Sequence, residues 1–332
     1  SASDRASRAA APRSASVKLK AASIYKELFG LSVPIIFTSV TVQLMYTIDS
    51  ILIKPLLSGH FEPDTIYMWG SVLVQRAQSI AGIPVILAVA LGQSIIPVIS
   101  SAYAKKDDKT VGQQASLAIR LAMFSGMPVI LLLSVGAYSV NGLLFSSDEG
   151  SAIVALLTFG TLFQIGMMIT NSILLGIGQP RKATMHAFTG ILLKIALGFA
   201  LAPSLGVYGL VLSTTVCFMW TLGFNILSLK KRTSFRIIEA RRWAGYAAAV
   251  AVTAAVLWAL QWTVLGLLGG LPAKVGYFFS SAVMGVAALG VYLVLLVLLK
   301  VITREEAESY PRPVRKLLAP IFRLQDARAA GR

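Results

Sequence analysis

Eight long stretches of apolar residues follow one another along the chain, and short polar segments separate them. They cover residues 28–53, 70–99, 114–140, 152–177, 184–202, 206–229, 244–268 and 275–300. A helix of about 20 apolar residues crosses the hydrocarbon core of a bilayer. None of the stretches shows the alternating pattern of a β-barrel strand, and a bilayer admits only helices or closed barrels. The pattern predicts an all-α integral membrane protein with about eight transmembrane helices.

The composition supports this fold class and excludes several others. Apolar residues make up 56% of the 332-residue chain and charged residues 13%, whereas a soluble domain has about 45–50% and about 25%. An ordinary cytosolic enzyme or a nucleic-acid-binding module is therefore excluded. The single cysteine, Cys217, forms no intrachain disulfide, and His60 and His186 lie too far apart in sequence to suggest zinc. We expect no metal, no cofactor and no nucleic-acid partner.

Basic residues are distributed unevenly over the segments between the predicted helices. Of the 30 Lys and Arg residues, 25 lie on one side, in segments 1–26, 105–109, 181–182, 230–242 and 300–332. The other side carries Lys54 and Lys274. Cytoplasmic loops are enriched in Lys and Arg, so both termini of this multi-pass protein are predicted to lie in the cytoplasm of a bacterial cell. The net charge of +16 then reflects topology and attraction to anionic lipids.

Charged residues inside the predicted helices are candidates for function, because they are costly in a membrane. Asp49 lies in the first helix, and Gln75 and Arg76 lie in the second. At about 1.5 Å per residue, Asp49 and Arg76 fall at a similar depth toward the predicted outer side. Arg76 is expected to pair with Asp49, to face a cavity and meet an anionic substrate, or to extend to the outer headgroups.

Two further polar residues lie deeper in the predicted helices. Lys194 is about midway along the fifth helix, without an acidic partner that the sequence identifies. It is expected to face a water-filled cavity and contact an anion, or to be satisfied by backbone carbonyls. Asn171 in the fourth helix is expected to form an interhelical hydrogen bond or to line a cavity.

Three segments resemble one group of known membrane transporters. Residues 28–53 (LFGLSVPIIFTSVTVQLMYTIDSILI), 81–111 (AGIPVILAVALGQSIIPVISSAYAKKDDKTV) and 173–216 (ILLGIGQPRKATMHAFTGILLKIALGFALAPSLGVYGLVLSTTV) are similar to the seventh, eighth and tenth-to-twelfth helices of that group. It comprises the polysaccharide transporters and lipid II flippases (MurJ-type and stage V sporulation protein B-type) of the MATE-like multidrug/oligosaccharidyl-lipid/polysaccharide superfamily. The resemblance covers about residues 24–301.

The resemblance implies a division of the chain into parts. Such transporters have two six-helix lobes around a cationic cavity, with two additional helices at the C-terminus. By this comparison residues 1–26 are a basic cytoplasmic linker and 27–232 are the second six-helix lobe. Residues 233–301 are the two additional transmembrane helices, and 302–332 are a basic amphipathic cytoplasmic tail. The first lobe has no counterpart in the sequence.

The resemblance also implies a function. The chain is expected to be the C-terminal portion of a flippase, not an enzyme, that translocates a polyprenyl-diphosphate-linked saccharide for peptidoglycan or polysaccharide synthesis. Its cavity would bind the diphosphate through a substrate-binding set: Arg76, Lys194, Asp49, Gln75 and Asn171. In the lipid II flippase pattern an Arg stands five residues before the eighth-helix proline; Ser79 holds that position here, and Arg76 lies three residues earlier.

The alternative reading is a cation-coupled multidrug exporter of the same superfamily, which requires acids within the helices; Asp49 is the one acid at such a depth. A membrane-embedded glycosyltransferase or a non-transporting scaffold is less favoured, because the predicted outer loops are short. The expected partners are membrane lipids, the lipid-linked saccharide, and a six-helix lobe from the same or a separate chain, or a second copy of this chain. A lone lobe with unpaired charges on its partner face would be unstable.

The charge asymmetry makes a prediction about topology. Cysteines introduced as Gly59→Cys and Ser147→Cys should react with a membrane-impermeant maleimide in intact cells. Cysteines introduced as Lys106→Cys and Ser234→Cys should react only after permeabilisation, because their loops belong to the basic side. Reaction at Lys106→Cys in intact cells would contradict the predicted orientation.

Overall fold

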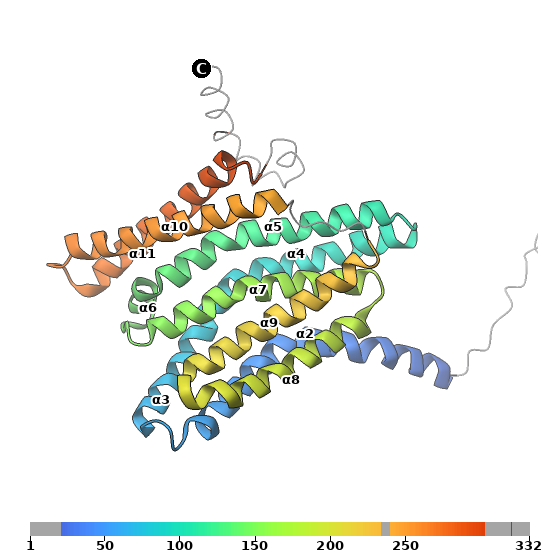
Figure 1. The fold of residues 1–332 in the computed structure, drawn as a ribbon, viewed down its shortest axis with the longest axis horizontal. Helices are drawn as coiled ribbons and strands as arrows, with labels where there is room; N and C mark the ends of the chain where they lie inside the picture. Colours follow the sequence, from blue (N-terminus) through green and yellow to red (C-terminus); the bar gives the residue numbers. More distant parts are fainter. Residues whose placement is uncertain (1–20, 234–239, 303–319, 321–332) are drawn as a thin grey trace, which may run out of the picture.

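A computed structural model describes residues 21–233, 240–302 and 320 of the chain, and in this part the named elements are all helical. They are α2 (Ala21–Leu57), α3 (Pro63–Ser71), the π-helix η1 (Val72–Ala77), α4 (Gln78–Ala104), α5 (Asp108–Val135), α6 (Ala137–Phe145), α7 (Ser151–Gly176), α8 (Pro180–Leu205), α9 (Val207–Lys230), α10 (Ala240–Leu267) and α11 (Ala273–Leu298) (Figure 1). Within the described residues, eight helices are long and apolar enough to cross a membrane. The all-α membrane fold is confirmed.

Several element boundaries differ from the sequence prediction. Helix α2 begins at Ala21, within the segment expected to be a linker. The second spanning helix begins at Pro63 and includes η1, so its helical hydrogen bonding changes in the middle. The third ends at Val135, and Gly136 separates it from the short helix α6. The predicted amphipathic tail and residues 1–20 lie outside the described residues.

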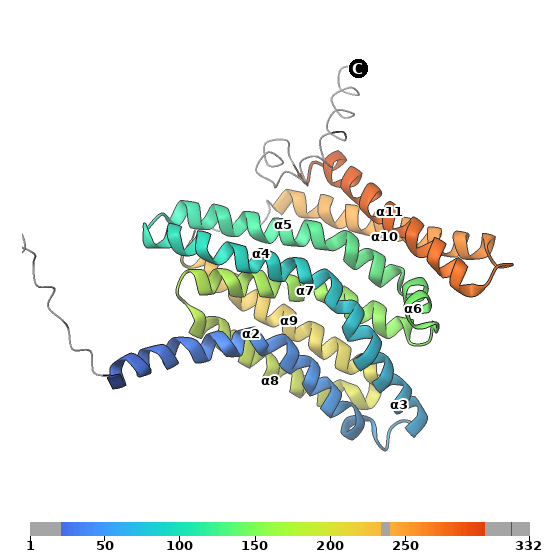
Figure 2. The same cartoon turned by 180° about the vertical axis from the view of Figure 1, so that it is seen from behind.

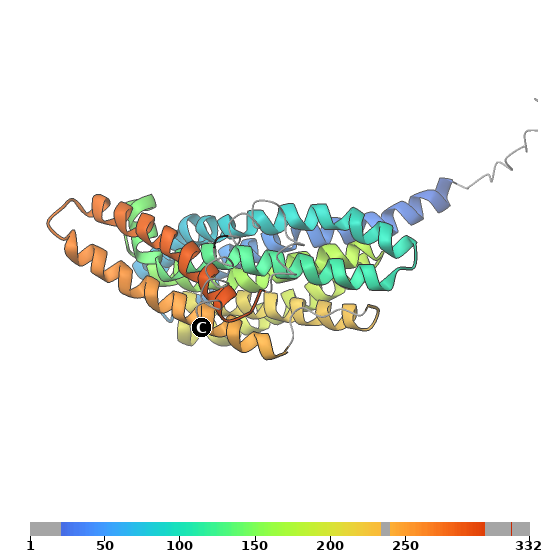
Figure 3. The same ribbon diagram turned by 90° about the horizontal axis from the view of Figure 1, so that it is seen from above.

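The helices form successive layers across the molecule. Helix α7 lies in the centre and packs against α4 and α5 on one side and α9 on the other. Helix α8 packs on α9, and α2 packs chiefly on α8 at one edge of the bundle (Figures 1 and 2). The α10–α11 hairpin covers α5 and α6 at the opposite edge and extends past the bundle at one end (Figure 3).

The two ends of the bundle differ in charge. At what we call the basic end, the loops contain Lys105 and Lys106 between α4 and α5, and Lys231 and Arg232 after α9. There Asp107 caps α5 and accepts hydrogen bonds from the backbone and hydroxyl of Thr110 at 3.0 and 2.6 Å, which lower the pKa of its carboxyl group. The opposite end has the loops 58–62, 146–150 and 268–272, with the tight turn at Gly206.

Small residues allow the central helices to approach closely. A Cβ atom on Gly190 of α8 would lie 2.6 Å from the hydroxyl of Thr221 in α9. A Cβ on Gly209 of α9 would lie 2.7 Å from the carbonyl carbon and oxygen of Leu201 in α8. Membrane helices associate through such close contacts, since lipid tails are as apolar as their side chains. The α8–α9 pair is therefore stabilised by close packing of the two helices at these glycines.

Helix α2 bends along its length in both side views (Figures 1 and 2). It contains Pro34, which removes a backbone donor from the helix. The carbonyl oxygen of Pro34 accepts hydrogen bonds from Thr38 and from Thr184 of α8, both at 2.8 Å. These bonds join α2 to α8 near the basic end.

The backbone contact at Gly209 makes a prediction about stability. Gly209→Ala should lower the apparent melting temperature of the purified protein, because the contacting atoms belong to the backbone and overpacking of this kind costs about 1–3 kcal/mol. Thermal unfolding in detergent measures the effect.

Gly223→Ala is the matched control, since no atom lies within 4 Å of its Cβ position and alanine favours the helix. If Gly209→Ala melted at the same temperature as Gly223→Ala, close packing of α8 on α9 would not limit stability.

Candidate functional site

Three side chains from three helices form a closed cluster inside the bundle. The ammonium of Lys194 in α8 pairs with Oδ1 of Asp49 in α2 and donates to Oγ1 of Thr214 in α9 at 2.6 Å. The Thr214 hydroxyl donates to Oδ2 of Asp49 at 2.9 Å. The exposed fractions of Asp49, Lys194 and Thr214 are 1%, 1% and 0%. Both carboxylate oxygens and the ammonium are therefore engaged within the protein.

This cluster corrects two sequence-based expectations. Asp49 pairs with Lys194 and not with Arg76, and Lys194 does have an acidic partner. The depth estimated from the sequence favoured Arg76, but α2 packs on α8, which brings Lys194 to the carboxylate. Because removal of one partner of a buried ion pair leaves an uncompensated charge, the cluster fixes α2 against α8 and α9.

Arg76 lies in the π-helix η1 and extends toward the end opposite the basic loops. Its side chain is partly exposed, and Nη1 donates to the backbone carbonyl of Glu149 at 3.4 Å. The guanidinium lies 5.6 Å from the centre of the Phe145 ring, within cation–π range. Short π-helical segments occur frequently at functional sites. Nothing in the sequence pattern indicated η1, which changes the direction in which Arg76 projects.

Gln75 is the neighbour of Arg76 but faces a different space. It is exposed and lines a cleft between the end of α2 and the α3–η1 segment, a cleft that Ser50, Lys54 and Tyr67 also line. Arg76 is not among the residues that line this cleft. Two adjacent residues of η1 thus point to two surfaces at the same end of the bundle.

Asn171 belongs to a third group, near the basic end. Asn225 of α9 donates to Oδ1 of Asn171 at 2.7 Å and to Thr170 at 3.0 Å, and its own Oδ1 lies 2.8 Å from Nδ1 of His186 in α8. Asn171 thus forms the interhelical hydrogen bond that was one of the two sequence expectations. His186, Asn225 and Thr214 were not selected from the sequence, where they resemble isolated polar residues in apolar helices.

The five sequence-selected residues therefore occupy three places. Asp49 and Lys194 are together, Gln75 and Arg76 are adjacent but face apart, and Asn171 is in the network of α7, α8 and α9. Among the described residues, no group of three or more His, Cys, Asp or Glu side chains is arranged to hold a metal ion.

These features define a class of protein: a multi-pass helical membrane protein with buried polar clusters between its helices. The sequence model of the family described as lipid II flippase MurJ matches residues 25–274. The chain belongs to this family.

Three relatives from Bacillus subtilis (strain 168) show how much of the family architecture is present. The uncharacterized membrane protein YabM is 24% identical over 86% of this chain and 53% of its own length. Lipid II flippase MurJ is 22% identical, over 66% of this chain and 41% of its own. The sporulation protein YkvU is 26% identical, over 51% and 38%. The chain thus spans about half the length, or less, of the curated relatives it matches.

The ion pair makes a prediction that a double-mutant cycle tests. Asp49→Asn and Lys194→Met should each reduce thermal stability, by up to about 3–5 kcal/mol if the remaining charge stays buried. The double variant should be more stable than either single variant, because it removes both charges. Melting temperatures in detergent measure the coupling.

A second double-mutant cycle, with Arg76→Met in place of Lys194→Met, provides the control. Combined with Asp49→Asn, Arg76→Met should show additive effects, since Asp49 contacts Lys194. Additivity between Asp49→Asn and Lys194→Met would instead show that the pair contributes no coupling energy.

Proposed function

We propose that this chain is the C-terminal portion of a flippase that moves a polyprenyl-diphosphate-linked saccharide, a precursor of peptidoglycan or another polysaccharide, across the bacterial cytoplasmic membrane. The observation that carries the proposal is the family match over residues 25–274. The name of the MurJ relative supplies the lipid II substrate. The basic end is proposed to face the cytoplasm, which follows from the distribution of Lys and Arg.

Within this proposal the five candidate residues have different roles. Arg76 and Gln75 are the residues with access to a head group, because both are at least partly exposed on η1. A guanidinium offers paired donors that match phosphate oxygens. Asp49 and Lys194 position α2 against α8 and α9, and Asn171 joins α7 to α9. In this conformation Lys194 is a positioning residue.

The rival function, a cation-coupled multidrug exporter, finds less support in the geometry. Such coupling requires a carboxylate within the helices that is free to bind the ion. Both oxygens of Asp49 are engaged, one by Lys194 and the other by Thr214. The cluster therefore favours a structural role for this carboxylate.

Transport is proposed to need a second lobe. Alternating access moves two rigid bodies around a site between them, and residues 27–232 supply one such body, with 233–301 as an added helix pair. A surface for the second lobe is available on α2 and α8, where large apolar side chains are exposed: Phe29, Val33, Ile36, Met185, Phe188 and Leu192. The second lobe would come from a separate six-helix segment or from a second copy.

The proposal predicts that a monomer of this chain does not transport. Residues 1–332 reconstituted into liposomes should not flip a fluorescent polyprenyl-diphosphate saccharide, whereas co-reconstitution with the N-terminal six helices of a full-length relative should restore flipping. Arg76→Ala should abolish the restored activity, and Arg76→Lys should restore only part of it, because lysine lacks the paired donors. Dithionite quenching of the fluorophore measures flipping.

Light scattering of the same sample identifies the oligomeric state. Robust flipping by a demonstrated monomer would contradict the need for a second lobe. Wild-type flipping by Arg76→Ala would contradict the role of Arg76.

A further inference from the structure

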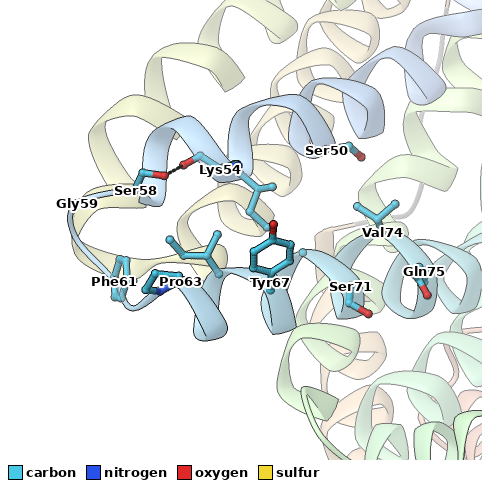
Figure 4. Close-up of a pocket in the computed structure, with 13 residues that line it drawn as sticks. Ser50, Lys54, Ser58, Gly59, Phe61, Pro63, Tyr67, Ser71, Val74 and Gln75 are labelled. Atoms are coloured by element: carbon cyan, nitrogen blue, oxygen red, sulfur yellow. Dashed lines mark hydrogen bonds between the residues drawn. The ribbon is translucent and has the colours of Figure 1, made fainter.

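A cleft of about 580 Å³ lies at the end of the bundle opposite the basic loops, between the last turns of α2 and the α3–η1 segment. Figure 4 shows Tyr67 standing between these two helices, with Ser71 and Gln75 along the same side of α3–η1. The Tyr67 side chain is 73% exposed, so its ring is accessible from the cleft.

Two rows of polar residues line this cleft. Ser50 and Lys54 lie on α2 and Ser58 directly follows its last residue, whereas Tyr67, Ser71 and Gln75 lie on α3–η1, in both cases at spacings of four residues. This spacing places side chains on one face of a helix. Within the described part of the chain, no hydrogen bond joins one row to the other.

The hydrogen-bonding capacity of the rows is largely unused. Ser50 donates to the carbonyl of Tyr46 and Ser58 to that of Lys54, so their oxygens can still accept a bond. Neither Lys54 nor Gln75 has a side-chain partner in the described part of the chain, and both can donate. No acidic residue lines the cleft; Glu62 lines a neighbouring hollow instead. The cleft therefore presents one cation, several hydroxyls and an amide.

The wall of the cleft is held in place by aromatic packing. Phe61 of the lining packs edge-on against Trp69 at 5.1 Å between ring centres, and Trp69 packs against Tyr208 of α9 at 6.4 Å. A Cβ on Gly206 would lie 2.5 Å from the Trp69 ring, so the α8–α9 turn closes directly on it. The cleft is thus largely pre-formed, as ligand sites usually are.

We propose that this cleft binds the glycosyl diphosphate head group of a polyprenyl-linked saccharide, with a sugar ring on Tyr67 and a phosphate on Lys54. An exposed aromatic face with neighbouring hydroxyls and an amide suits a sugar, which has an apolar face and many hydroxyls. A cation in a lining that contains no carboxylate suits a phosphate. The identity of the ligand rests on the proposed function, and in the proposed topology the site lies on the external side.

The proposal is tested by binding, which does not require transport. The chain is placed in phosphatidylcholine nanodiscs, and the affinities of radiolabelled polyprenyl diphosphate with and without N-acetylglucosamine are compared. The sugar-bearing probe should bind more tightly. Tyr67→Ala should remove this preference, whereas Tyr67→Phe should keep it because the ring remains. Lys54→Gln should weaken both probes by roughly tenfold, as expected for loss of one charge-assisted contact.

Lys274→Gln is the matched control for charge, since Lys274 is an exposed lysine at the same end but outside the cleft. It should leave both affinities unchanged. Wild-type affinities in Tyr67→Ala and Lys54→Gln would overturn the proposal. Equal competition by phosphatidylglycerol would also overturn it, because the cleft would then be a phospholipid site.

The outcomes separate this site from the function of the whole protein. If sugar binding depends on Tyr67 but the chain with its second lobe does not flip the lipid, the proposed function is contradicted and the proposed binding site in the cleft is supported. If the lipid is flipped but binding does not depend on Tyr67 or Lys54, the proposed binding site in the cleft is contradicted and the proposed function is supported.

Discussion

The position of α2 depends on one interaction, the buried pair of Asp49 and Lys194. A charge inside a membrane must be paired or hydrated, and here each member has its partner on a neighbouring helix, with Thr214 bridging both. Helix α2 lies at the edge of the bundle and packs chiefly on α8. The pair therefore fixes the rotation of α2 about its axis, and this rotation turns Ser50, Lys54 and Ser58 toward α3.

Polar contacts divide the lobe into a rigid part and a part joined at few points. Helices α7, α8 and α9 share the His186–Asn225–Asn171 network near the basic end and the close contacts of Gly190 and Gly209. Helix α2 is joined to them by the ion pair, by Thr184 at Pro34, and by Tyr46, whose hydroxyl donates to Gln164 at 3.0 Å. These contacts join α2 to the central helices at Pro34, near the basic end, and at Tyr46 and Asp49, farther along the helix.

The sequence predicted the spanning helices well, because the bilayer imposes length and apolarity on each one separately. It did not predict which charges meet. Asp49 and Arg76 were at equal depth, but pairing also depends on which helices are neighbours and on their rotation, and residues 145 positions apart in the chain satisfied both conditions. The sequence did not predict the π-helix η1 either, since its residues, VLVQRA, have no feature that distinguishes a π-helix from an α-helix. The sequence thus predicted the length and apolarity of each helix, but not which helices are neighbours or which side chains meet between them.

The pairing of Asp49 with Lys194 changes the argument for the proposed second lobe. Unpaired Asp49 and Lys194 on an interface would have made the lone lobe unstable in lipid. Both are instead buried within the bundle, and the exposed side chains of α2 and α8 include large apolar ones, such as Ile36 and Phe188, which are compatible with lipid tails. The buried pair is therefore no reason to expect the isolated chain to be unstable in lipid. In the proposed transport cycle a single body has no second surface against which to rock, so the proposed requirement for a partner lies in that cycle and not in stability.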